Sequence, residues 1–215
     1  MTERRYNLNL LDIQRKLLER DISIISGVSF ARIFQLSRRY SKTLLSLAVK
    51  HHLLTRIKAG IYTLNAKPPM QFEIANVLYA PSYISLETAL SYYRIIPGTV
   101  YVIRSITTKK PKEYTKFNRT FSYSKIKKNL YFGYKVSLIG DRKILIAEKE
   151  KAFLDYIYFV AVGKKKLDDR INLSILDKSK INSILPHFRK VIRGRKLKAF
   201  NNLIKKFYDF PPENK

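Results

Sequence analysis

The spacing of apolar residues predicts that the chain begins with three helices. Leu10, Ile13 and Leu17 recur every three or four residues and therefore lie on one side of a first helix. Ser29 precedes an apolar run and is expected to cap a short second helix. A break at residues 35–37 separates it from a third helix. The residues expected on the buried face of this third helix are Tyr40, Leu44, Leu47, Ala48 and His51.

The segment after the third helix is typical of a basic hairpin. Residues 54–58 and 61–64 suggest two short strands joined at Ala59-Gly60. Helix, helix, turn, helix and hairpin is the order of a winged helix-turn-helix, in which one helix enters the major groove of DNA. The basic and hydroxyl side chains expected to face outward and contact DNA are Arg38, Arg39, Ser41, Lys42, Ser46, Lys50, Arg56 and Lys58.

A basic amphipathic helix is most often a solvated face, so the helix alone would not indicate DNA binding. Its place before a hairpin, in a strongly basic chain, favours DNA contact. The stiff segment Ala66-Lys67-Pro68-Pro69 marks the expected end of this unit. The sequence therefore predicts a DNA-binding domain over residues 1–66 and a second domain over residues 67–215.

The second domain mixes helical and strand patterns. Residues 70–96 look helical, with Ser85 as a cap. Strand formers dominate four later segments, residues 99–108, 117–126, 131–138 and 143–147. Helices are then expected at residues 153–161, 172–185 and 197–207. The predicted fold class is α+β, a winged helix-turn-helix followed by a larger domain of helices and a mainly antiparallel sheet.

Charge points to a polyanionic partner. The 215 residues include 43 Lys and Arg against 16 Asp and Glu, a formal charge of +27, while 46% are apolar, which is too many for a disordered basic tail. No cysteine is present, which excludes disulfides and thiolate sites. No apolar run reaches the roughly 20 residues needed to span a bilayer, and the charged N-terminus is unlike a signal peptide. We therefore expect a cytoplasmic protein.

Positive charge is densest between residues 104 and 128, where aromatic residues alternate with it. Such strands could hold phosphates and stack bases, as in proteins that bind single strands. Alternatively, Tyr114, Phe117, Phe121 and Tyr123 face the core and the lysines keep an edge strand from pairing. Both interpretations stay open, and an RNA-binding protein is the alternative function. The cations of this C-terminal basic patch are Arg104, Lys109, Lys110, Lys112, Lys116, Arg119, Lys125, Lys127 and Lys128.

Groups that would carry out a reaction are missing from the sequence. It contains no glycine-rich phosphate loop, no paired-histidine zinc motif and no nucleophile elbow. Asp168-Asp169 lies beside three lysines, which suits a surface ion-pair patch better than a metal site. We therefore expect no catalytic activity, no metal and no cofactor.

Four segments resemble the AbiEi family, the antitoxins of the AbiE abortive-infection systems. Residues 79–90 read Tyr-Ala-Pro-Ser-Tyr-Ile-Ser-Leu-Glu-Thr-Ala-Leu, similar to the start of that family's C-terminal domain. Residues 56–64 resemble its wing, residues 106–110 its basic strand end, and residues 146–155 its helix with alanine, glutamate, lysine and aspartate. One departure is Lys149, where the family pattern has proline.

The resemblance implies a function in a toxin–antitoxin system that gives phage resistance. Members of the family act as transcriptional repressors that bind inverted repeats in the double-stranded DNA of their own promoter, which is autoregulation. Their C-terminal domain also counters a nucleotidyltransferase toxin without a stable complex, the type IV mode. Because basic surfaces repel one another, we expect a monomer in solution that pairs on DNA.

Overall fold

The computed structural model describes residues 8–98, 100–168 and 170–208. The chain divides between Ile74 and Ala75 into two compact units, called here the N-terminal unit and the C-terminal unit. The stiff Pro68-Pro69 segment therefore precedes this division rather than coinciding with it. The fold of the whole chain is mixed α+β, as the sequence predicts.

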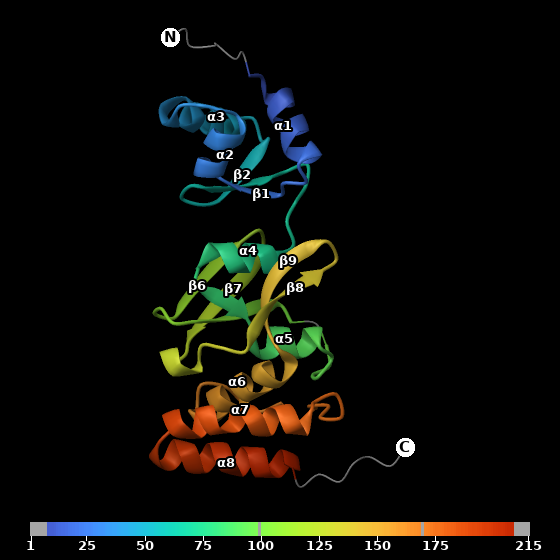
Figure 1. Cartoon of the computed structure of the whole chain (residues 1–215), viewed down its shortest axis with the longest axis vertical. Helices are drawn as coiled ribbons and strands as arrows, with labels where there is room; N and C mark the ends of the chain where they lie inside the picture. Colours follow the sequence, from blue (N-terminus) through green and yellow to red (C-terminus); the bar gives the residue numbers. More distant parts are fainter. Residues whose placement is uncertain (1–7, 99, 169, 209–215) are drawn as a thin grey trace. The chain divides into compact units, whose positions relative to one another are not determined.

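The N-terminal unit contains three helices and a three-stranded antiparallel sheet (Figure 1). The strand order is β1-β3-β2, and β1 is an element that the sequence patterns did not predict. Apolar side chains from all three helices and from the sheet form one core, in which Phe30 is fully buried. The elements are α1 (Leu10–Glu19), β1 (Ile24–Ser26), α2 (Gly27–Ile33), α3 (Arg38–Lys50), β2 (Leu54–Lys58) and β3 (Ile61–Leu64).

Polar caps fix where the helices of this unit begin. Asn9 accepts a hydrogen bond from the backbone N–H of Asp12 at the start of α1. The cap of α2 is Ser26, which accepts from the N–H of Ser29, so the expected cap at Ser29 is wrong. Ser37 caps α3 by accepting from the N–H of Tyr40, and the predicted break before this helix is confirmed.

The C-terminal unit is built around a six-stranded mixed sheet (Figure 1). Its strand order is β6-β7-β5-β4-β9-β8, with three antiparallel and two parallel pairings. The strands are β4 (Ser82–Ile84), β5 (Val102–Thr107), β6 (Lys112–Lys116), β7 (Arg119–Lys125), β8 (Tyr134–Ile139) and β9 (Arg142–Ala147). The four predicted strands match β5, β7, β8 and β9, while β4 and β6 were not predicted.

The helices of the C-terminal unit centre on α6, as its nearly all-apolar sequence predicts. This helix packs against α5, α7 and α8, and nine of its thirteen residues are buried. Helix α4 spans the division between the two units. The helical elements are α4 (Gln71–Leu78), α5 (Leu86–Tyr92), the 3₁₀ turn η1 (Lys128–Leu130), α6 (Lys149–Ala161), α7 (Lys178–Val191) and α8 (Gly194–Tyr208).

Candidate nucleic-acid interface

Helix α3 presents one face to the core of the N-terminal unit and the other to solvent. Its buried residues Leu44, Leu45 and Ala48 pack into that core. Tyr40 and Leu47, which the sequence pattern placed inside, are 41% and 40% exposed. The buried face is therefore turned towards Ser41 and Leu45 relative to the prediction, while Leu44 and Ala48 are buried as expected.

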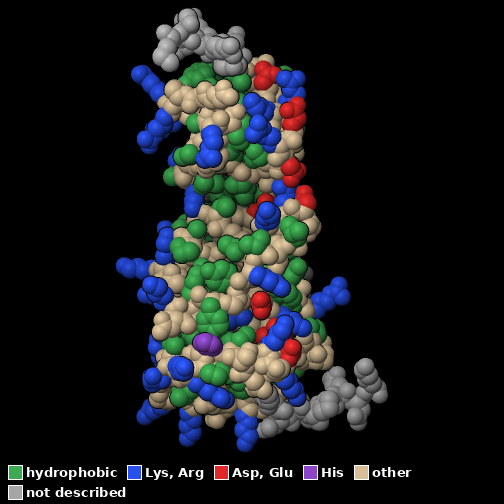
Figure 2. Space-filling view, in the orientation of Figure 1, with side chains coloured by type: hydrophobic (Ala, Val, Ile, Leu, Met, Phe, Trp, Pro, Cys, Tyr) green, Lys and Arg blue, Asp and Glu red, His purple; other side chains and the backbone are tan. Residues whose placement is uncertain are grey.

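The exposed face of α3 carries most of the predicted DNA contacts. Four of these residues are spaced four positions apart, so they follow a single row along the helix. Among the residues that the structure describes, none of the cations of α3 forms an ion pair or a side-chain hydrogen bond. Lys and Arg side chains project from the surface around α2 and α3 (Figure 2). The exposed residues are Arg38, Arg39, Lys42, Ser46 and Lys50.

Ser41 is the exception among the predicted contacts on α3. Its side chain is 3% exposed, and its hydroxyl donates to the carbonyl oxygen of Arg38 at 3.1 Å. The prediction that Ser41 faces outward is therefore wrong. A single rotation of α3 about its axis, relative to the predicted orientation, exposes Tyr40 and Leu47 and buries Ser41.

The β2–β3 hairpin follows α3 and has a tight tip. Gly60 has φ +74°, a conformation that disfavours a side chain, and nothing lies within 4 Å of the position of an added Cβ. The carbonyl oxygen of Gly60 accepts from the N–H of Gly27 at 2.9 Å, which attaches the tip to the start of α2. Arg56 is exposed and Lys58 half-buried, and the strand register shifts between them.

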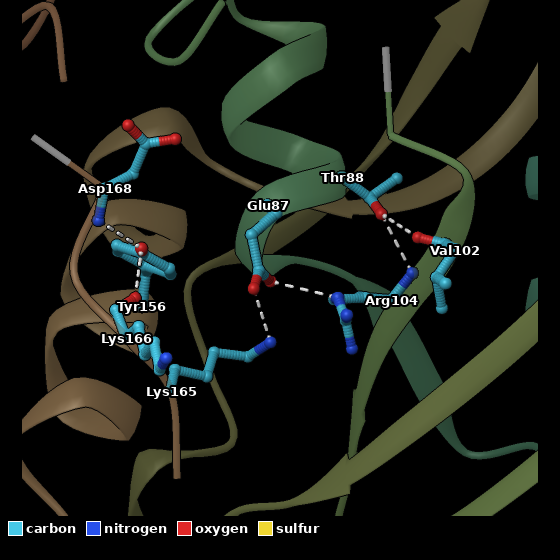
Figure 3. A network of polar contacts seen from close by, with 8 residues as sticks. All are labelled: Glu87, Thr88, Val102, Arg104, Tyr156, Lys165, Lys166 and Asp168. Carbon is cyan, nitrogen blue, oxygen red and sulfur yellow. Dashed lines mark hydrogen bonds and ion pairs between the residues drawn. The ribbon is translucent and has the colours of Figure 1, made fainter. Parts of the chain in front are cut away.

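The C-terminal basic patch does not form one continuous surface of unpaired charge. Arg104 Nε lies 3.3 Å from Glu87 Oε2, and Lys165 Nζ donates to Glu87 Oε1 at 2.5 Å (Figure 3). Burial lowers the pKa of Lys165, although Glu87 partly offsets this. Lys109 Nζ donates to the carbonyl oxygen of Ala80 at 2.6 Å. Two of the patch cations, Arg104 and Lys109, therefore have structural partners.

The aromatic residues of the patch separate into two groups. Phe121 and Tyr123 on β7 are 0% and 1% exposed and belong to the core. Burial raises the pKa of Tyr123 well above its ordinary value, and its hydroxyl donates to the carbonyl oxygen of Ala75. Phe117 is 43% exposed, and Tyr114 is half-buried under Lys112. Of the two interpretations of this patch, base stacking and packing into the core, the second therefore holds for β7, whose aromatic side chains face inward.

The sequence patterns did not predict a buried polar cluster in the C-terminal unit. Lys151 pairs with Asp155 one turn along α6, and both are 0% exposed. Asp155 Oδ2 also accepts from Tyr83 at 3.1 Å and from Ser85 at 2.9 Å. Burial lowers the pKa of Lys151 and raises that of Asp155. A Lys and an Asp four residues apart in a largely apolar helix were the available signal.

Two comparisons with known proteins found no relative. No protein-family model matches the chain, and a search of curated proteins finds no match.

Within residues 8–98, 100–168 and 170–208, no cluster of three or more His, Asp or Glu side chains is placed to hold a metal ion. Over the same ranges, every helix is too short or too polar to cross a membrane.

Proposed function

We propose that this chain is a DNA-binding autorepressor and the antitoxin of an AbiE-type operon. In this proposal the N-terminal unit is a winged helix-turn-helix, with α3 as recognition helix and the β2–β3 hairpin as wing. The element order α1-β1-α2-α3-β2-β3 and the three-stranded sheet support this assignment. The resemblance of residues 79–90 and 146–155 to the AbiEi family supports the antitoxin part.

The observation that carries the DNA-binding proposal is the row of cations on α3 without protein partners. Arg38, Lys42 and Lys50 form this row beside Arg39, and all four are exposed. An unpaired, solvent-facing cation can displace counterions from a phosphate, which favours binding to a duplex. A helix fits the major groove, where Arg39 can donate two hydrogen bonds to a guanine. Arg56 and Lys58 of the hairpin then reach the backbone.

A gel-shift titration with the DNA upstream of its own gene tests this proposal. Arg39→Ala should weaken operator binding by about 1 to 3 kcal/mol if the side chain reads a guanine. Arg15→Ala is the matched control, because Arg15 is an exposed cation of the same unit that pairs with Asp12 on α1. Equal losses for both variants would contradict a groove-reading role for α3. Equal loss of Arg39→Ala on operator and random DNA would assign Arg39 to phosphate contact.

Salt dependence gives a second measure of the same interface. Contact with six to ten phosphates would lower affinity by about 10³ to 10⁵ between 50 and 200 mM salt. A nearly salt-independent affinity would contradict the proposed phosphate contacts.

The antitoxin part has its own support and its own test. Two of the segments that resemble the family, residues 79–90 and 146–155, are in contact, since Tyr83 and Ser85 donate to Asp155. Co-expression with a nucleotidyltransferase encoded beside it should restore growth without the two proteins co-purifying. Growth arrest that persists when this chain is abundant would contradict the antitoxin role.

The alternative function is RNA binding through the basic sheet, and the structure removes part of the evidence for it. The inward position of Phe121 and Tyr123 removes two of the four aromatic residues that could stack on bases. Competition of labelled operator by structured RNA at equal salt separates the two functions. If RNA displaces the duplex at lower concentration, the repressor proposal fails.

A further inference from the structure

A hollow of about 490 Å³ lies where four segments of the C-terminal unit meet. Its volume falls within the roughly 300 to 1,000 Å³ typical of small-molecule sites. The segments are the residue before η1, the C-terminal half of α6 with the turn after it, the α7–α8 link, and the first turn of α8. The hollow is lined by Lys127, Tyr158, Val162, Lys164, Ile192, Arg193, Arg195 and Lys196.

The lining combines an apolar floor with a basic rim. Tyr158 and Val162 supply most of the apolar surface, since Ile192 is only 3% exposed. Tyr158 is held in place by contacts with Phe159 and Phe188. Five lining residues are Lys or Arg and none is Asp or Glu. All five cations are exposed. A ligand that suits this lining has several negative charges and a flat or apolar part.

Two of the rim cations are positioned by the end of α7. Lys127 Nζ donates to the carbonyl oxygen of Val191 at 2.8 Å, and Arg193 donates to the carbonyl oxygens of Arg189 and Ile192. Carbonyl oxygens at the end of a helix orient these side chains and carry only partial negative charge, so each cation keeps a net positive charge. Among the described residues, Arg195 and Lys196 have no side-chain hydrogen bond and no ion pair. The rim therefore carries positive charge that only a bound anion would balance.

We propose that this hollow binds a nucleoside phosphate, with its phosphate groups at the basic rim and its ring system on the floor at Tyr158. Lys and Arg bind phosphate oxygens by charge-assisted hydrogen bonds, and Tyr offers a surface on which a base stacks. The ligand is either a free nucleotide or the end of a nucleic-acid chain, since both present the same chemistry. Lys and Arg side chains gather on the surface formed by α7 and α8 (Figure 2).

This site does not depend on the proposed repressor function. It lies wholly within the C-terminal unit, whereas the operator contacts belong to α3 in the N-terminal unit. Arg39→Ala should therefore leave nucleotide binding unchanged. Conversely, a failure of nucleotide binding would leave operator binding by α3 untouched.

Calorimetric titration of the full chain at about 100 mM salt tests the site with ATP, inorganic triphosphate and a short 5′-phosphorylated RNA as probes. The double variant Arg195→Ala, Lys196→Ala should weaken binding of ATP or the RNA at least tenfold. The double variant Lys198→Ala, Lys205→Ala is the control, because it removes the same charge from exposed positions of α8 that do not line the hollow. It should weaken binding less than threefold. Circular dichroism confirms that both variants are folded.

The probes also distinguish the sources of the ligand. Tight ATP binding that depends on Arg195 and Lys196 would assign the site to a free nucleotide. Rim-dependent binding of the RNA alone would assign it to a nucleic-acid end. Equal losses in both double variants, or no binding of either nucleotide probe, would overturn the proposal. Equal affinity for triphosphate and ATP would overturn the role of the apolar floor.

Discussion

In the N-terminal unit the cationic side chains of α3 are exposed to solvent. In the C-terminal unit, by contrast, Lys151 and Lys165 form ion pairs with carboxylates. Both units are basic, and their net charges do not reveal this difference. Arg39 has no side-chain partner among the described residues, while Arg104 shares Glu87 with Lys165. A charged side chain that pairs with an opposite charge of the protein contributes to the fold, whereas an unpaired one is available to bind a ligand. The position of partners therefore indicates function better than the sum of charges does.

The largest test of this comparison is the buried pair in α6. Lys151→Met alone should lower the free energy of unfolding by about 3 to 5 kcal/mol, because it leaves Asp155 buried without a counterion. Urea unfolding followed by circular dichroism measures the loss. The double variant Lys151→Met, Asp155→Leu should recover most of it. A single variant that is as stable as the natural chain would mean that Lys151 is not a structural cation.

A smaller effect is expected at the partly buried Glu87. Glu87→Gln should cost about 1.5 to 3 kcal/mol of stability, since it weakens the contacts with Lys165 and Arg104 at once. Affinity for operator DNA should stay the same. A gel shift beside the unfolding experiment checks both. Increased DNA affinity in the variant would show that Arg104 or Lys165, once released from Glu87, binds nucleic acid directly.

The reverse result is expected for Lys42 on α3. Lys42→Ala should leave the unfolding midpoint unchanged, because the side chain is exposed and has no partner among the described residues. It should lower the slope of log affinity against log salt by about 0.9, the contribution of one phosphate contact. Titrations at several salt concentrations give the slope. An unchanged slope would remove Lys42 from the interface.

The smallest effect concerns Asp168 and Arg170 at the surface. Hydrogen bonds from Arg170 lower the pKa of Asp168 below its ordinary value. Since the folded pKa is the lower one, the stabilisation is present at neutral pH and is lost as the pH falls through that value. Asp168→Asn should cost about 0.2 to 1 kcal/mol at neutral pH. Unfolding midpoints of the variant and the natural chain should converge in acid, and a constant difference would contradict the assignment.

Local patterns predicted most of the elements, and long-range contacts decided the rest. Apolar spacing was sufficient to predict α3 and α6 as helices, because helix signals lie within a few residues. The three-residue strands β1 and β4 were missed because their pairing partners, such as Thr63 for Ile24, are distant in the sequence. The rotation that buries Ser41 depends on the shape of the core and has no local signal.

The candidate sites divide in the same way. The exposed cations of α3 and the hairpin follow from periodicity, since an amphipathic helix exposes its polar side. The hollow proposed to bind a nucleotide is lined by residues that are distant in the sequence, such as Lys127 and Arg195. Only the folded chain therefore brings the cations of its rim together. The cluster around Asp155 likewise gathers residues from three elements or their caps.

The length of α3 limits how much sequence one copy can read. Thirteen residues at about 1.5 Å each extend about 20 Å, and at about 3.4 Å per base pair this matches about six base pairs. A six-base-pair word recurs on the order of once in four thousand base pairs by chance, which is too often to single out one promoter in a genome. In the proposed repressor, recognition of a unique promoter site would thus require two copies that bind adjacent six-base-pair half-sites. The occupancy of that site would then rise steeply with protein concentration.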